Sequence, residues 1–193
     1  KQIVCVVELT ASFEEERNIY WAQALENVGA HVVYGMVGLK THSKAILVVR
    51  QENDGLRCYA HIGTGNYHTT TATTYTDIGL FTADGEIVED LVDLFHYLTG
   101  RSLKSDYRKL LVAPINMRDR FLALIERERD NARQGLPSRI IAKMNGFDEH
   151  TFGRALYRAS QDGVKIDLIV RGACTLRPRV PGLSDNIRVI SIV

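Results

Sequence analysis

Short apolar runs and helical patterns alternate along the chain, and this alternation constrains the fold more than any other feature. Apolar runs bounded by turn residues predict strands. Segments that open on a capping residue or close at a glycine predict helices. Such an alternation is typical of an α/β architecture. The predicted strands are 3–9, 31–37, 45–50, 57–62, 140–144, 164–170 and 187–193, and the predicted helices are 12–28, 84–99, 117–134 and 152–161.

Two parts of the chain resemble each other. Lys1–Leu9 is similar to Val164–Gly172, and Ala30–Tyr34 is similar to Asn186–Ile190. Similarity at a fixed order of elements indicates an internal structural repeat. We therefore expect two related units, each opening on an apolar strand.

Bulk composition is ordinary for a soluble globular protein, with 45% hydrophobic and 24% charged residues. No apolar run reaches the length of a membrane span. The three cysteines are an odd number without metal-type spacing, which predicts a reducing, cytoplasmic compartment and no zinc site. The chain opens inside a strand pattern and without methionine, so we expect a piece of a longer protein.

The first half of the chain is acidic and the second half basic, although the net charge is only +1. Residues 1–100 hold 6 Lys and Arg against 13 Asp and Glu, and residues 101–193 hold 18 against 10. This split points to a polyanion partner for the second half. The alternative is a solvated helix face, which suits 118–133, where acids interleave with arginines. It suits Arg171, Arg177 and Arg179 less well, because few acids surround them.

A histidine, a lysine and a glycine turn carry the candidate chemistry. His42 and Lys44 precede Ala45–Val49, which predicts a buried strand. Because strand side chains alternate, His42 and Lys44 would point the same way and reach one bound group. Imidazole is nucleophilic near neutral pH, and an ammonium beside it neutralises phosphate oxygens. Gly63–Asn66 offers backbone N–H groups and an amide to an anion. Together they predict a phosphohistidine site, although a lone His-x-Lys pair is also common on surfaces.

These motifs and the sequence segments around them resemble polyphosphate kinase of the long, histidine-phosphorylated class, in its C-terminal catalytic region. The resemblance implies an α/β fold of phospholipase D-like repeats, each a mixed β-sheet flanked by helices. It divides the chain into a first catalytic repeat, 1–113, and the start of a second, 114–193, both incomplete. The sequence segments that carry the resemblance are Val7-Glu8-Leu9, Gly38-Leu39-Lys40-Thr41-His42, His61-Ile62-Gly63-Thr64-Gly65-Asn66-Tyr67, Tyr75-Thr76-Asp77, Leu80-Phe81-Thr82-Ala83-Asp84, Gly135-Leu136-Pro137-Ser138 and Leu168-Ile169-Val170-Arg171-Gly172.

The activity that the resemblance implies is reversible transfer of the ATP γ-phosphate to inorganic polyphosphate. His42 would carry the phosphate covalently and Lys44 would neutralise it. Tyr75 and Arg171 would bind ATP, although Tyr75 by itself suits a half-buried core tyrosine. The resemblance also implies Mg²⁺ as cofactor, ATP, ADP and polyphosphate as partners rather than nucleic acid, and a full-length homo-oligomer that can associate with membranes.

Two further residues stand beside the glycine turn, and one position departs from the family's pattern. Asn66 lies in the turn and His61 beside it, and both are expected to contact ATP or phosphate. Where the family carries an arginine of the metal and phosphate region, this chain has Ser12, which can cap a helix but supplies no cation. The metal ligands are therefore left undefined, and we expect weaker ATP binding than in typical relatives.

Two other functions stay open at this point. A phospholipase D-type phosphodiesterase would use the same histidine with water as acceptor. Those hydrolases carry an aspartate a few residues after the lysine, whereas Ala45–Arg50 contains no acid. The other alternative is an inactive fragment that binds polyanions. Because a matching second histidine does not occur before Val193, we expect the fragment by itself to be inactive.

Overall fold

The chain folds into two compact units. The computed structural model describes residues 2–9, 15–36, 38–102 and 106–192. Unit 1 is Lys1–Thr73 with Asp77–Leu110, and unit 2 is Thr74–Thr76 with Leu111–Val193. The division lies close to the predicted boundary at 113 and 114, while the assignment of the parts as catalytic repeats stays a prediction. Ser12, predicted to cap a helix, lies outside the described residues.

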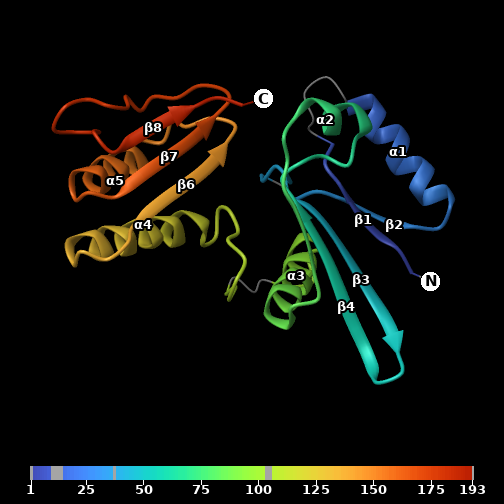
Figure 1. The fold of residues 1–193 in the computed structure, drawn as a ribbon. Helices are drawn as coiled ribbons and strands as arrows, with labels where there is room; N and C mark the ends of the chain where they lie inside the picture. The colour runs from blue at the N-terminus through green and yellow to red at the C-terminus, as the bar shows by residue number, and fades with distance from the viewer. Residues whose placement is uncertain (1, 10–14, 37, 103–105, 193) are drawn as a thin grey trace. The chain divides into compact units, whose positions relative to one another are not determined.

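Unit 1 begins with a two-stranded parallel sheet and a helix that connects its strands (Figure 1). Strand β1, Val4–Val7, pairs with β2, His31–Tyr34, so that Val4 lies opposite His31. Helix α1, Glu15–Asn27, joins the two strands and packs on β2. Gly29 follows the helix with a φ of +86°, a left-handed conformation that glycine adopts without steric cost.

A second, antiparallel sheet completes the strands of unit 1. It contains β3, Lys44–Glu52, β4, Gly55–Gly63, and β5, Gly79–Thr82, in that order. The short helix α2, Thr69–Thr74, lies between β4 and β5 in the chain. The predicted turn at Asn53–Gly55 is confirmed, because Glu52 pairs with Gly55 across it.

The predicted burial of Ala45–Val49 is wrong. Within β3, Val48 is 49% exposed and Val49 is 58% exposed. Strand β3 is at the edge of the sheet, and β5 pairs only with Ala60–Gly63 at one end of β4. The far end of the hairpin is therefore a two-stranded ribbon, as Figure 1 shows. Two strands without a covering layer cannot bury their apolar side chains.

Helix α3, Gly85–Leu98, is the main source of buried apolar residues in unit 1 and packs on β3 and β4. The predicted cap is confirmed: Asp84 Oδ1 accepts a hydrogen bond from the Ile87 N–H at 3.0 Å. On the buried face, the carboxylate of Asp90 accepts hydrogen bonds from the N–H groups of 108, 109 and 110. Burial raises the pKa of Asp90, but these three bonds outweigh it and the pKa is lowered.

Unit 2 is a parallel three-stranded sheet with helices on one face. Its elements are α4, Met117–Arg133, β6, Arg139–Met144, α5, His150–Gln161, β7, Lys165–Val170, and β8, Ile187–Ile190. The strand order is β6-β7-β8, and all three point the same way (Figure 1). Strand β7 alternates buried and less buried residues, and its buried side chains form one hydrophobic cluster with Ile125 of α4 and Leu156 of α5.

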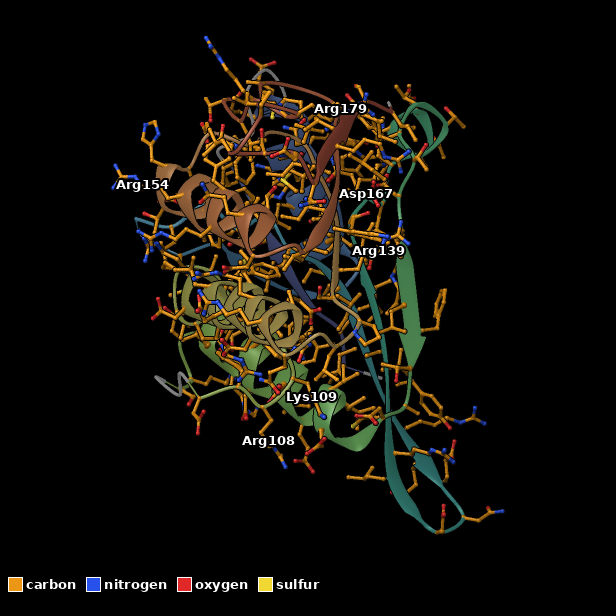
Figure 2. The ribbon with its side chains drawn as sticks, turned by 60° about the vertical axis from the view of Figure 1, so that its left-hand side comes forward. Arg108, Lys109, Arg139, Arg154, Asp167 and Arg179 are labelled. Carbon is orange, nitrogen blue, oxygen red and sulfur yellow. The ribbon has the colours of Figure 1, made fainter. Side chains whose placement is uncertain are left out.

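Many of the basic residues of unit 2 are neutralised by neighbouring acids. On α4, Arg129 and Arg133 pair with Asp162, and Arg129 also pairs with Glu126. The helix 117–133 is thus the solvated face that its alternating charges predicted. Across the sheet, Asp167 on β7 lies between Arg139 on β6 and Arg188 on β8, at 2.7 and 2.6 Å; Figure 2 labels the first two. Asp167 thereby offsets part of the positive charge of these two arginines.

The predicted elements are confirmed with their ends shifted by a few residues, but α2 and β5 were not predicted. Helix α2 is six residues of threonine and alanine without an apolar period, and β5 has four residues. Both are too short for a periodicity to be visible. None of the helices within the described ranges is long and apolar enough to cross a membrane.

Candidate functional site

His42 lies in the loop before β3 rather than in the strand. The strand begins at Lys44, so the alternation argument for His42 and Lys44 is wrong. The two are brought together differently, because the Lys44 ammonium donates to the backbone carbonyl of His42. Among the described residues, neither ring nitrogen of His42 has a hydrogen-bond partner. Its exposed imidazole is therefore oriented by the backbone that carries it.

The register of the hairpin brings the glycine turn and the loop of this histidine to the same end of the two strands. Lys44 lies opposite Gly63 in the antiparallel pair, so the turn 64–66 and the loop that ends at Ser43 adjoin the same end of the hairpin. Thr64 closes the turn: its N–H donates to the Ile78 carbonyl at 3.0 Å, and its hydroxyl donates to Asp77 Oδ1 at 2.7 Å. In the part of the chain that the structure describes, the N–H groups of Gly65 and Asn66 have no acceptor. These two groups can receive an anion.

His61 is held within the sheet and does not point freely into solvent. Its Nδ1 shares a hydrogen bond of 2.7 Å with the Tyr67 hydroxyl, and its ring centroid lies 4.4 Å from that of Phe81. A Cβ at Gly79 would lie 2.6 Å from His61 Nε2, so any other residue there would force this ring to move. The Asn66 side chain, in contrast, has no described partner and remains accessible.

The charges around His42 favour its neutral form. Partial burial lowers the pKa of the imidazole, and the ammonium groups of Lys44 and Lys40 lower it further by repulsion. The pKa of Lys44 is lowered as well, because burial outweighs the attraction of Asp77. A histidine pKa below its ordinary value keeps the ring unprotonated, and therefore nucleophilic, at neutral pH.

A second group of predicted residues comes together in unit 2. Arg171 begins the loop after β7, and its guanidinium carbon lies 3.8 Å from the centroid of the Tyr75 ring. Tyr75 is 39% exposed, and so is not the core residue that its surroundings in the sequence also allowed. A cation over an aromatic face is attracted by the ring quadrupole. Tyr75 and Arg171, which were each predicted to bind ATP, therefore contact each other. Residues 74–76 belong to unit 2, as Arg171 does.

Asn145, which the sequence did not single out, fixes the Arg171 side chain. It follows β6, and its Oδ1 accepts from Arg171 Nε at 2.8 Å while its carbonyl accepts from the Gly172 N–H at 2.7 Å. The carboxyl ends of parallel strands are where open α/β sheets bind ligands. With Nε bonded, the terminal nitrogens of the guanidinium can hold two oxygens of a phosphate.

The loop between β7 and β8 carries further arginines on a backbone held by buried bonds. The hydroxyl of Ser184, which is fully buried, donates to the Arg177 carbonyl at 2.7 Å and accepts from the Val180 N–H at 2.9 Å. Arg179 has a φ of +56°, which is uncommon outside glycine. Its place in unit 2 is labelled in Figure 2. Among the described residues, Arg177 and Arg179 have no acidic partner, as their sparse surroundings predicted.

No protein site for a metal is visible within the described ranges. They contain no group of three or more His, Cys, Asp and Glu that could hold an ion. The position that the family resemblance connects with metal, Ser12, is not among them. Sequence reasoning missed Asp77 and Asn145, which act through hydrogen bonds to residues distant in the sequence. The only signal for Asp77 was its place in the quoted segment Tyr75-Thr76-Asp77, and Asn145 had none.

Comparison with family models assigns both units. Residues 1–104 match the model described as polyphosphate kinase C-terminal domain 1, and residues 110–193 match polyphosphate kinase C-terminal domain 2. The chain belongs to the polyphosphate kinase family.

Curated relatives and a solved structure agree with this assignment. The chain is 61% identical to a polyphosphate kinase of Thermosynechococcus vestitus and 58% identical to one of Synechocystis, over all 193 residues. It spans 26% of the length of each, or about a quarter. The crystal structure of polyphosphate kinase from Porphyromonas gingivalis is 41% identical, with a TM-score of 0.84, and the match covers 100% of this chain and 32% of that one. The predicted fold class is thereby confirmed.

Proposed function

We propose that this chain forms part of a polyphosphate kinase that transfers the γ-phosphate of ATP to polyphosphate through a phosphate bound to His42. The observation that carries the proposal is the pairing of Lys44 with Gly63. This pairing sets a neutral histidine, a lysine and the two unbonded N–H groups of Gly65 and Asn66 on neighbouring segments. A nucleophile, a cation and an anion-binding turn are the groups that phosphoryl transfer needs.

The first step is attack of an unprotonated ring nitrogen of His42 on the γ-phosphorus. The new N–P bond forms while the bond from the γ-phosphorus to the bridging oxygen breaks, and ADP leaves with that oxygen. The lowered pKa of His42 supports this role, because a protonated ring has no free electron pair. In the second step a terminal oxygen of polyphosphate attacks the phosphorus, and the N–P bond breaks. The reverse sequence makes ATP from ADP.

The residues of unit 2 would recognise the nucleotide. Arg171 supplies a fixed guanidinium fork, and Tyr75 supplies an aromatic face. We propose that Mg²⁺ enters with the nucleotide phosphates as Mg²⁺–ATP, because Mg²⁺ in phosphoryl-transfer sites is usually bound by substrate phosphates with one or two carboxylates. The three cysteines are unpaired thiols, which suits the proposed cytoplasmic location.

The test is intact-mass analysis of the full-length protein after incubation with Mg²⁺–ATP. We expect one added phosphate that is lost in acid. The variant His42→Ala should lose this phosphate, and the matched control His96→Ala, an exposed histidine on α3, should keep it. A phosphate that survives in His42→Ala would overturn the assignment of the nucleophile.

The same preparation separates the two alternative functions. Hydrolysis of a phosphodiester without phosphate transfer to polyphosphate would favour the phosphodiesterase. Salt-dependent binding of polyphosphate without any phosphohistidine would favour the polyanion-binding protein, because release of condensed counterions makes such binding sensitive to salt.

A further inference from the structure

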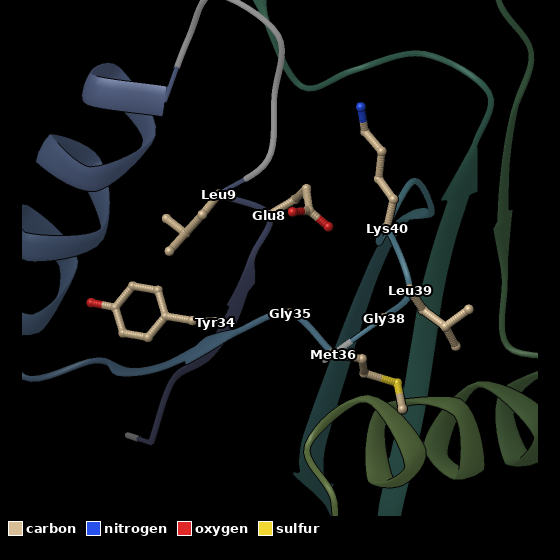
Figure 3. Close-up of a pocket in the computed structure, with 8 residues that line it drawn as sticks. All are labelled: Glu8, Leu9, Tyr34, Gly35, Met36, Gly38, Leu39 and Lys40. Atoms are coloured by element: carbon tan, nitrogen blue, oxygen red, sulfur yellow. The ribbon is translucent and has the colours of Figure 1, made fainter.

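The loop that carries His42 is poorly supported by packing. Its described residues, 35–36 and 38–43, lie between β2 and β3 and are mostly exposed, and 35–36 and 38–40 border an open cavity of about 360 Å³. The lining includes Gly35, Met36, Leu39 and Lys40 (Figure 3). A segment beside an empty space lacks the contacts that fix side chains in a close-packed interior. The position of the loop must therefore depend on polar bonds.

One carboxylate supplies such a bond directly before the nucleophile. Glu8 follows β1, and its Oε2 accepts a hydrogen bond from the backbone N–H of Thr41 at 2.6 Å. Figure 3 shows this carboxylate pointing from the end of β1 toward the segment of Leu39 and Lys40. A hydrogen bond to an ionised acceptor is stronger than one between neutral groups.

Glu8 is itself held in place from two sides. The Asn18 side chain of α1 donates to the Glu8 carbonyl at 2.9 Å. Gly35, at the end of β2, approaches closely enough that a Cβ there would lie 3.7 Å from Glu8 Oε2 and 3.9 Å from Thr41 Oγ1. Three segments, from β1, β2 and the entry to β3, therefore converge at this carboxylate. Because β1-β2 and β3-β4-β5 are separate sheets, this bond ties one sheet to the other.

We infer that Glu8 is a positioning residue for His42 and holds the nucleophile loop through the N–H of Thr41. His42 has no side-chain hydrogen bond within the described ranges, so the direction of its imidazole follows from the backbone at 41 and 42. Loss of the Glu8 bond would release that backbone over the cavity. This inference rests on the proposed function of His42, and it adds a residue whose role is geometric rather than chemical.

Three substitutions of Glu8 in the full-length protein separate the effect of its side-chain length from the effect of its charge. Glu8→Gln keeps the chain length and an acceptor oxygen but removes the charge. Glu8→Asp keeps the charge but withdraws the carboxylate by one methylene, and Glu8→Ala removes the acceptor. The matched control is Glu26→Ala, which removes an exposed acid whose described bond goes to the Tyr34 hydroxyl.

The readouts are the single-turnover rate of phosphohistidine formation at saturating ATP, the KM for ATP and the hydrogen exchange of the Thr41 amide. We expect Glu8→Ala and Glu8→Asp to slow phosphohistidine formation by about tenfold or more, the factor that loss of a charged hydrogen bond represents. KM should change little, and the Thr41 amide should exchange faster. Glu8→Gln should stay within about threefold of the parent, since a neutral bond is about half as strong.

The inference is overturned if Glu8→Asp reacts as fast as the parent, or if Glu8→Gln is as slow as Glu8→Ala. Hydrogen exchange at Thr41 keeps the test independent of the proposed function. If the parent forms no phosphohistidine, the proposed function fails, whereas unchanged Thr41 exchange in Glu8→Ala would show that the bond itself is absent. Should Glu8→Ala fail to fold, the comparison of Glu8→Asp with Glu8→Gln still decides.

Discussion

Glu8 in unit 1 and Arg171 in unit 2 occupy matching places with opposite charge. Each follows the first strand of a parallel pair, β1 with β2 or β7 with β8. Glu8 accepts a hydrogen bond from the Thr41 N–H, and Arg171 donates one to Asn145 Oδ1. The carboxylate turns to the protein's own backbone, whereas the terminal nitrogens of the guanidinium have no hydrogen-bond partner among the described residues. The same position after a parallel strand thus holds a side chain that supports the backbone in unit 1 and one that leaves charged groups accessible in unit 2.

The two units also differ in how they are packed. The buried strand β7 of unit 2 lies in one hydrophobic cluster with two helices. Unit 1 divides its strands between two sheets and leaves large apolar side chains such as Leu56 and Phe81 more than 70% exposed. We infer that unit 2 depends on its own core, whereas the hairpin of unit 1 contributes little to stability by itself.

The largest expected effect tests this difference in packing with one substitution made in both units. Leu168→Ala removes a side chain that is 1% exposed and should lower the free energy of unfolding by about 2–5 kcal/mol. Leu56→Ala, at a position 73% exposed, should lower it by less than about 1 kcal/mol. Urea unfolding with hydrogen exchange resolved by unit measures both. Equal losses would mean that the hairpin is packed in solution.

A second pair of variants compares the close approaches at glycine. In Gly172→Ala the new Cβ would lie 2.8 Å from the Asn145 carbonyl oxygen, and backbone cannot swing aside. We expect a loss of about 1–3 kcal/mol of stability and weaker ATP binding. In Gly79→Ala the Cβ would meet the His61 ring at 2.6 Å, and a ring can rotate away.

The midpoint temperature of thermal unfolding should therefore be lower for Gly172→Ala than for Gly79→Ala. The latter should instead alter the NMR signals of His61 as its bond to Tyr67 breaks. A fully stable Gly172→Ala protein with unchanged ATP affinity would show that Asn145 does not need its present position.

The smallest expected effect concerns the cations around the nucleophile. Lys44→Met removes a positive charge that lowers the pKa of His42, so this pKa should rise toward about 6.5. At a given acidic pH less of the ring is then neutral, and the acid limb of phosphohistidine formation moves to higher pH. NMR titration of the His42 ring measures the pKa directly. Lys40→Met should give a smaller shift in the same direction, and a downward shift in either variant would contradict the electrostatic account.

Elements that depend on local signals could be predicted from the sequence. Asp84 caps α3 as expected, and the turn at Asn53–Gly55 sets the register that brings Gly63 to Lys44. The strand β7 with Arg171 at its end was predicted because an apolar run ends there. In each case the residues that decide the structure lie within a few positions of one another.

Features that depend on contacts between residues distant in the sequence could not be predicted. The apolar run of β3 has the composition of a buried strand, but burial depends on what covers it, and the neighbours lie elsewhere in the chain. Strand β3 begins at Lys44 because its pairing with β4 ends there, opposite Gly63, which is 19 residues further along the sequence. His42 therefore lies outside the strand. The contacts of Arg171 with Tyr75 and Asn145 join segments that no periodicity connects.

The loop from Arg171 to Asn186 carries a consequence for the thermodynamics of ligand binding. Its backbone is held by the buried Ser184 hydroxyl, by the bond from the Arg177 N–H to Tyr157 and by the bond from Gln161 to the Gly182 carbonyl. A polyanion that binds Arg177 and Arg179 would have to order only their side chains. Since immobilising each such side chain costs about 0.5–1.5 kcal/mol and the backbone adds no further loss of entropy, weak individual contacts can still sum to useful affinity.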